Sequence, residues 1–81
     1  MIDQEIIHVK AIWDNEARVW VATSEDVPGL ITESENLEDM VQKLKTLIPE
    51  LLEANGSISK FKRTEIPFHF FSERSEIASC K

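Results

Sequence analysis

Residue types that commonly do chemistry are sparse in this chain. Its two histidines, His8 and His69, lie far apart with no cysteine near either, so they lack the spacing of a metal site. The single cysteine, Cys80, is the penultimate residue, where a mobile thiol cannot be held against a base as nucleophilic catalysis requires. We therefore expect no catalytic residues, and we expect that the protein is not an enzyme.

Adjacent carboxylates occur at Glu25–Asp26 and at Glu38–Asp39, and carboxylate oxygens are ligands that Mg²⁺ accepts. Neighbouring side chains on a strand or a helix point in different directions, so neither pair forms a ready site. A turn and a helix cap account for the two pairs more simply. We expect no metal ion and no cofactor.

Acidic residues are concentrated in the first part of the chain. The net charge is −6, and residues 1–59 carry twelve acidic against four basic side chains, a net −8. Such a surface suits a basic protein partner, because complementary potentials speed encounter. The alternative is that the charges only keep a small domain soluble. From charge alone, the candidate partner-binding residues are Glu25, Asp26, Glu33 and Glu35.

One basic cluster departs from this pattern: Lys60, Lys62 and Arg63 surround Phe61. Aromatic and basic side chains together can bind single-stranded nucleic acid. Three charges on an acidic protein are a weak signal, and lysines that protect a strand edge from pairing explain them as well. We expect no nucleic-acid partner.

An amphipathic helix from Asn36 to about Asn55 is the clearest structural element. Asn36 is placed to cap it, with Asp39 three residues further on. Pro49 removes a helical hydrogen bond and predicts either a kink or a short second helix that has Pro49 in its first turn. One continuous apolar stripe follows from the i, i+3, i+4 spacing of Leu37, Met40, Val41, Leu44, Leu47, Ile48, Leu51 and Leu52.

Strand-like segments flank this helix. Four strands are expected at residues 5–13, 17–23, 30–33 and about 60–71. Asp14-Asn15-Glu16 predicts a hairpin turn between the first two, and Pro28-Gly29 predicts a turn before the third. Pro67 cannot donate to a strand ladder, so it favours an edge position or an irregular position for the last strand.

The helix must cover something, and the strands are the available surface. We expect an α+β fold in which one helix lies on an antiparallel-type sheet of about four strands, in the order βββαβ. Residues 1–71 would form the domain and residues 72–81 a flexible tail. No apolar run approaches the roughly 18 residues that span a bilayer, and the start of the chain lacks the features of a signal peptide. We expect a cytoplasmic protein without membrane contact.

The helix can cover only one face of the sheet. A monomer does not normally expose the large apolar surface that would remain on the other face. Either a bulge shifts the assignment of the faces, or the second face is an interface, and we expect a homodimer built on this face or on the edge of the last strand. Both histidines could also point to this face. Its apolar residues would be Ile6, Ile12, Trp20, Ala22 and Phe71, and the candidate dimer contacts are Ile6, Ile12, Trp20 and Phe71.

Two motifs resemble a known family. The run from Val27 to Glu33, Val-Pro-Gly-Leu-Ile-Thr-Glu, followed by Leu-Glu-Asp-Met at residues 37–40, is similar to the core of HicB-like domains. Trp13-Asp14 and the run from Val19 to Leu30 resemble more closely a short, uncharacterised prokaryotic branch of that superfamily, which lacks the DNA-binding C-terminus. The most specific part of this resemblance is the stretch from Trp20 to Leu30. The similarity covers residues 6–70.

This resemblance implies the same βββαβ fold and the role of an antitoxin. The partner it implies is a small basic ribonuclease toxin, which the antitoxin would neutralise by occlusion, and the acidic composition suits such a partner. No catalytic residue is carried over, because the domain acts by binding an enzyme. The alternative is a stand-alone, homo-oligomeric regulatory domain with no toxin partner.

Overall fold

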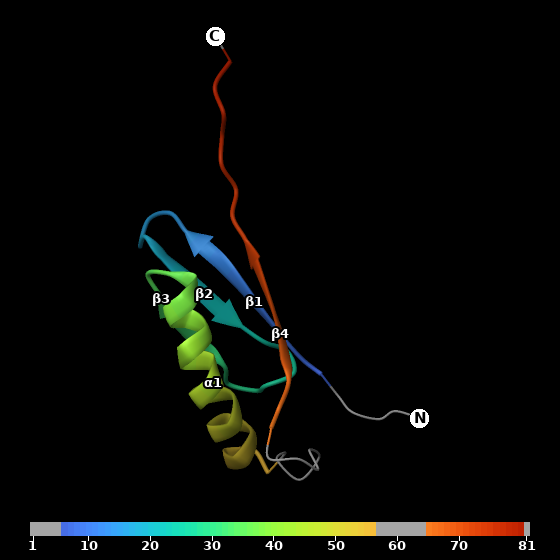
Figure 1. The fold of residues 1–81 in the computed structure, drawn as a ribbon. Coiled ribbons are helices and arrows are strands. Elements are labelled where there is room, and N and C mark those ends of the chain that lie inside the picture. Colours follow the sequence, from blue (N-terminus) through green and yellow to red (C-terminus); the bar gives the residue numbers. More distant parts are fainter. Residues whose placement is uncertain (1–5, 57–64, 81) are drawn as a thin grey trace.

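The computed structural model describes residues 6–56 and 65–80, which form a four-stranded sheet and a single helix (Figure 1). The elements in chain order are β1 Ile7–Asp14, β2 Val19–Thr23, β3 Ile31–Ser34, α1 Leu37–Ala54 and β4 Phe68–Glu73. The α+β fold and the order βββαβ are therefore confirmed. The basic cluster at residues 60–63 lies outside the described residues.

The sheet is mixed, and not of the antiparallel type that was expected. Its strand order is β3-β2-β1-β4; the β1–β2 and β2–β3 pairs are antiparallel, whereas β4 lies parallel to β1. The helix explains this direction. By crossing the sheet, α1 returns the chain to the end at which β3 began, so β4 runs in the same direction as β3 and therefore as β1.

An aspartate side chain closes the β1–β2 hairpin. The carboxylate Oδ1 of Asp14 accepts hydrogen bonds from the backbone N–H groups of Glu16 (3.0 Å) and Ala17 (3.1 Å). The N–H of Arg18 donates to the Asp14 carbonyl at 2.7 Å, and Arg18 has a left-handed φ of 60°. The turn predicted at residues 14–16 is confirmed, and it holds β1 and β2 in one register.

The helix begins where the capping pattern predicts. The Oδ1 atom of Asn36 accepts the backbone N–H of Asp39 at 2.7 Å. Pro49 lies inside a single α-helix, so the alternative of a separate second helix is wrong. At the other end the chain leaves the helix through Asn55 and Gly56, and Gly56 has a φ of 72°, which glycine adopts without strain.

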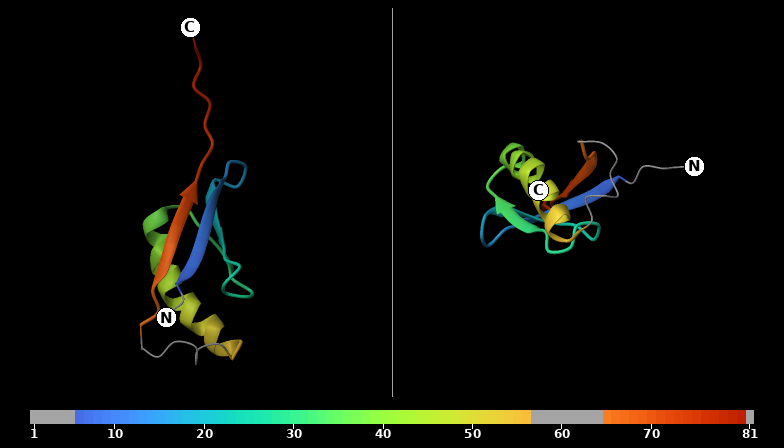
Figure 2. Two further views of the ribbon diagram at one scale, coloured as in Figure 1. Left: turned by 90° about the vertical axis from the view of Figure 1, so that its right-hand side faces the viewer. Right: turned by 90° about the horizontal axis from the view of Figure 1, so that it is seen from below.

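One face of the sheet and the apolar stripe of α1 form the core. Met40, Leu44 and Ile48 are at most 1% exposed. Figure 2 shows α1 on this face and no other drawn helix or strand over the opposite face. The buried hydrophobic residues of the described chain are Ile7, Val9, Ala11, Trp20, Ala22, Val27, Leu30, Met40, Leu44, Ile48 and Leu52.

The last strand, β4, lies at an edge of the sheet, as Pro67 indicated. Pro67 immediately precedes the strand, and its carbonyl accepts a backbone N–H from β1 at 3.3 Å. The strand continues to Glu73, two residues past the expected end at Phe71. Residues 74–80 then leave the domain in line with β4, without regular secondary structure (Figures 1 and 2).

Candidate functional site on the open face of the sheet

We call the face of the sheet opposite α1 the open face. Four large hydrophobic side chains are exposed on it: Ile6 (40%), Ile12 (46%), Ile31 (70%) and Phe71 (53%). A contiguous exposed apolar patch commonly marks a contact site, whereas isolated exposed hydrophobic residues are ordinary. The residues that strand alternation and register place on the open face are Ile6, His8, Lys10, Ile12, Val19, Val21, Thr23, Ile31, Glu33, His69, Phe71 and Glu73.

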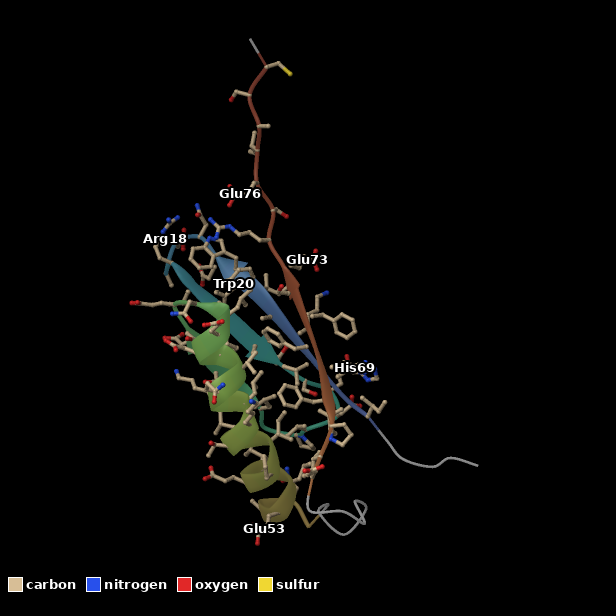
Figure 3. All side chains as sticks on the ribbon, in the orientation of Figure 1. Arg18, Trp20, Glu53, His69, Glu73 and Glu76 are labelled. Carbon is tan, nitrogen blue, oxygen red and sulfur yellow. The ribbon has the colours of Figure 1, made fainter. Side chains whose placement is uncertain are left out.

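Three aromatic rings form a cluster on this face. His8 and His69 are partners across the β1–β4 pair, and their rings meet edge to face at 5.5 Å. Phe71 stacks on His8 at 6.1 Å and lies 6.3 Å from His69. Figure 3 shows His69 pointing away from α1. Both histidines therefore lie on the face expected for them, beside the exposed Phe71.

Asp26 and Ser24 lie at the border of the aromatic cluster. Asp26 Oδ2 accepts the backbone N–H of His8 at 2.8 Å and lies 3.4 Å from His8 Nδ1. The Ser24 hydroxyl donates to the His8 carbonyl at 2.6 Å and accepts the Asp26 N–H at 3.1 Å. Because this hydroxyl donates to a carbonyl and not to the imidazole, the three residues do not have the geometry of a nucleophilic triad. Their contacts hold the loop after β2 against the start of β1.

The four carboxylates predicted to bind a partner form two separate groups. Glu25 and Asp26 follow the C-terminal end of β2, whereas Glu33 and Glu35 lie beside its N-terminal end, because β3 runs antiparallel to β2. All four residues are exposed. The structure therefore does not bring them together into one acidic patch.

The group at Glu33 and Glu35 is the more strongly negative one. These two residues line a surface depression together with Asp39 and Lys43. The Lys43 ammonium group donates to the backbone carbonyl of Glu33 at 2.5 Å, so one cation lies among three carboxylates. The depression keeps a net negative charge beside the open face, which suits a basic partner.

Trp20 and Ala22 do not lie on the open face, and their assignment to it from the sequence is wrong. Trp20 is 9% exposed and Ala22 is fully buried, both beneath α1. The hairpin register is the reason: it pairs Trp20 with Trp13, and directly paired residues of neighbouring strands share a face. The two indole rings pack edge to face at 5.4 Å. The other proposed dimer contacts lie on the open face: Ile6, Ile12 and Phe71.

Ile31 is the main open-face residue that the sequence pattern did not indicate. It pairs with Thr23 and is 70% exposed, while its neighbour Leu30 is buried at 4%. Two apolar residues in succession do not reveal which of them points inward. The pairing of β3 with β2 decides between them.

At one end of the sheet, the Trp13 indole contacts two guanidinium groups. The Arg18 Cζ is 5.3 Å from the indole centroid and the Arg74 Cζ is 4.3 Å from it. A cation over an indole face contributes about 0.5–1 kcal/mol at an exposed site. Arg74 is the first residue after β4, so this contact ties the beginning of the C-terminal segment to the helix side of the sheet.

Within residues 6–56 and 65–80, no group of three or more His, Cys, Asp or Glu side chains is arranged to hold a metal ion. Cys80 is exposed in the C-terminal segment. In the same described part of the chain, no helix combines the length and apolarity needed to cross a membrane.

The fold and the open face define a small α+β domain with one helix on a four-stranded sheet, and the chain belongs to the family described as a domain of unknown function, DUF1902, whose model matches residues 6–79. It is similar to a solved structure, the hypothetical protein TTHA1013 from the extremely thermophilic bacterium Thermus thermophilus, with 42% identity and a TM-score of 0.67. That similarity covers 94% of this chain and 100% of the other. None of the curated proteins matches the chain.

Proposed function

We propose that this protein is a non-catalytic protein-binding module that uses the open face of its sheet, and that it acts like a HicB-type antitoxin. Its partner would be a small basic ribonuclease, which the module silences by covering its active surface. The observation that carries this proposal is the open face itself, where Ile12, Ile31 and Phe71 are between 46% and 70% exposed. Such residues favour association, because their burial releases water from apolar surface.

The charge of the molecule favours a basic partner. The net charge is −6, and Glu33, Glu35 and Asp39 contribute carboxylates at the rim of the open face. An interface commonly combines an apolar centre with a polar rim, and complementary charge at the rim increases the rate of encounter. Occlusion by such a surface needs no catalytic group on the antitoxin.

The same surface also favours a second function, that of a stand-alone homo-oligomeric domain with no toxin. Contact between two copies would bury the open-face hydrophobic residues equally well. A neighbouring reading frame that encodes a small basic protein would favour the antitoxin, and its absence would favour the oligomeric domain.

Co-expression of such a neighbour with and without this chain tests the antitoxin function through growth and co-purification. We expect the neighbour alone to arrest growth and this chain to restore it. The double charge reversal Glu33→Lys/Glu35→Lys should weaken complex formation by about tenfold or more, because it places like charges against a basic surface. Growth arrest that persists when the folded chain is present would reject the antitoxin function.

A matched control separates the rim of the open face from total charge. The variant Glu50→Lys/Glu53→Lys makes the same change on exposed positions near the C-terminal end of α1. We expect it to bind the partner within about threefold of the unmodified protein, because rim charges act locally at physiological ionic strength. Equal losses for both double variants would show that the acidic depression is not the contact site.

A further inference from the structure

The C-terminal segment, residues 74–80, is called the arm below. We propose that the arm of one copy pairs antiparallel with the free edge of β4 in a second copy, and that the exchange is reciprocal. The product is a two-fold symmetric dimer in which the two four-stranded sheets join through their β4 edges. This association is compatible with the proposed binding role but does not require a toxin.

The arm continues the alternation of β4. Arg74 lies over Trp13 on the helix side and forms an ion pair with Glu76 two residues further on. Side chains two residues apart in an extended chain share a face, so even-numbered arm residues lie on the helix side. Glu73 forms an ion pair with Lys10 at 3.2 Å on the open face. Ile77 therefore has the same phase as the open-face residues of β4.

The arm makes little contact with its own domain beyond its first residue. Figures 1 and 2 show it extending past the end of the sheet, and Ile77 is 93% exposed. The sequence Arg-Ser-Glu-Ile-Ala-Ser-Cys contains no Gly, Asn or Asp, the residues that adopt the positive φ of a two-residue hairpin turn. The arm is therefore poorly suited to fold back onto its own β4. A strand edge of another copy can supply the backbone hydrogen bonds it lacks.

Alternate residues of β4 direct their backbone N–H and C=O groups toward the free edge of the strand. The Ile7 N–H donates to the Pro67 carbonyl. The odd-numbered residues of β4 therefore direct their backbone N–H and C=O groups toward β1. The even-numbered residues Phe68, Phe70 and Ser72 direct theirs outward. Among the described strands, β4 has only β1 as a neighbour, and β4 contains neither Lys nor Pro to discourage pairing.

One pairing register allows the backbone hydrogen bonds between the two copies and also brings their exposed apolar side chains together. With the two-fold axis at Arg74, Ala78 lies opposite Phe70 of the second copy in a hydrogen-bonded pair. Ile77 then lies opposite Phe71 of the second copy on the open face. This pairing brings together the side chains that are 93% and 53% exposed in the single chain. Each Glu76 also lies diagonally beside Arg74 of the other copy, which offsets the meeting of the two Arg74 residues at the axis.

The family match supports a role for the arm in this pairing. The family model matches residues 6–79 and so covers most of residues 74–80. Most of the arm therefore lies within the region that the family model matches, together with the sheet whose edge it would extend.

Disulfide cross-linking tests the register directly. In a Cys80→Ser background, the single variants Phe71→Cys and Ile77→Cys are purified, mixed and oxidised. The mixture should give a disulfide-linked dimer on a non-reducing gel, because directly opposed residues of a non-hydrogen-bonded pair have Cα atoms about 4.5 Å apart. Each variant alone should remain unlinked, since its two equivalent cysteines would lie about 20 Å apart along the strand pair. No cross-link in the mixture beyond that of the single variants would overturn the proposal.

A pair of proline variants tests the backbone pairing by light scattering at micromolar concentration. The unmodified protein should have twice the chain mass of 9.3 kDa. Ala78→Pro removes an N–H directed at the second copy and should raise the dimer dissociation constant about tenfold or more, whereas Ser79→Pro removes one directed away and should change it less than about threefold. A monomeric mass for the unmodified protein, or equal effects of the two prolines, would overturn the arm exchange. The growth assay of the antitoxin function does not depend on the mass of the protein or on cross-linking. The antitoxin function and the arm exchange can therefore fail separately.

Discussion

Single polar side chains fix the points at which this chain changes direction. Asn36 caps the helix and Asp14 closes the hairpin, and both act on backbone groups within three residues. Such contacts depend on local sequence, which is why both were predictable. The contact between Asp26 and the His8 backbone joins residues 18 positions apart and had no signal in the sequence.

The helix cap leads to a prediction about stability. Asn36→Ala removes the acceptor of the 2.7 Å bond from the Asp39 N–H and the 3.1 Å bond from Asn36 Nδ2 to the Asp39 carboxylate. We expect a loss of about 1 kcal/mol in the free energy of unfolding, which lowers Tm by about 4–8 °C in a domain of this size. Thermal denaturation followed by circular dichroism measures it. Gln42→Ala, at an exposed position of the same helix, is the control and should change Tm little.

At the scale of elements, the apolar stripe of α1 was predictable in full. Its residues follow the helical period, and Met40, Leu44, Ile48 and Leu52 are the buried ones. The two strand faces were predictable as alternating sets, but the face of β2 that the helix covers was not. A shift of one residue in the pairing moves every side chain to the opposite face, and the hairpin closure decides the register.

Pro49 provides a test at this scale. A proline inside a helix removes one backbone hydrogen bond and crowds the carbonyl of Lys45, at a cost of about 3 kcal/mol. The helix nevertheless continues from Leu37 to Ala54. We expect Pro49→Ala to raise the free energy of unfolding by about 1–3 kcal/mol, as measured by urea denaturation. Glu50→Ala is the neighbouring control at an exposed position. A fall in stability for Pro49→Ala would show that packing of the proline ring outweighs the backbone cost.

At the scale of the whole molecule, a single thin core supports the domain. An 81-residue chain buries a smaller fraction of its surface than a larger one, and its net stability is of the order of 5–10 kcal/mol. One deep substitution in the core should therefore affect every element at once. The open face stays available for contact because the single helix covers only the other side.

Leu44→Ala tests whether the helix and the sheet unfold cooperatively as one core. Leu44 is 0% exposed at the centre of the stripe, and such truncations cost about 2–5 kcal/mol. We expect the urea midpoint to fall for helix and sheet signals together, as in a two-state transition. The control variant is Lys45→Ala, at the exposed neighbouring position. It should change the free energy of unfolding by less than about 0.5 kcal/mol. Separate transitions for the helix and the tryptophan signals would contradict a single core.

The sequence by itself determined the α+β class, the order βββαβ, the helix with its Asn36 cap, and the first hairpin turn. These features follow from periodicity and from side chains that bond to nearby backbone. Only the tertiary structure decided that Trp20 is buried, that β4 is parallel to β1, and that the predicted carboxylates form two groups. These outcomes depend on strand register and on the path of the chain across the sheet, which bring together residues far apart in sequence. A local pattern specifies the period of the side chains but not how two distant segments are aligned when they pair.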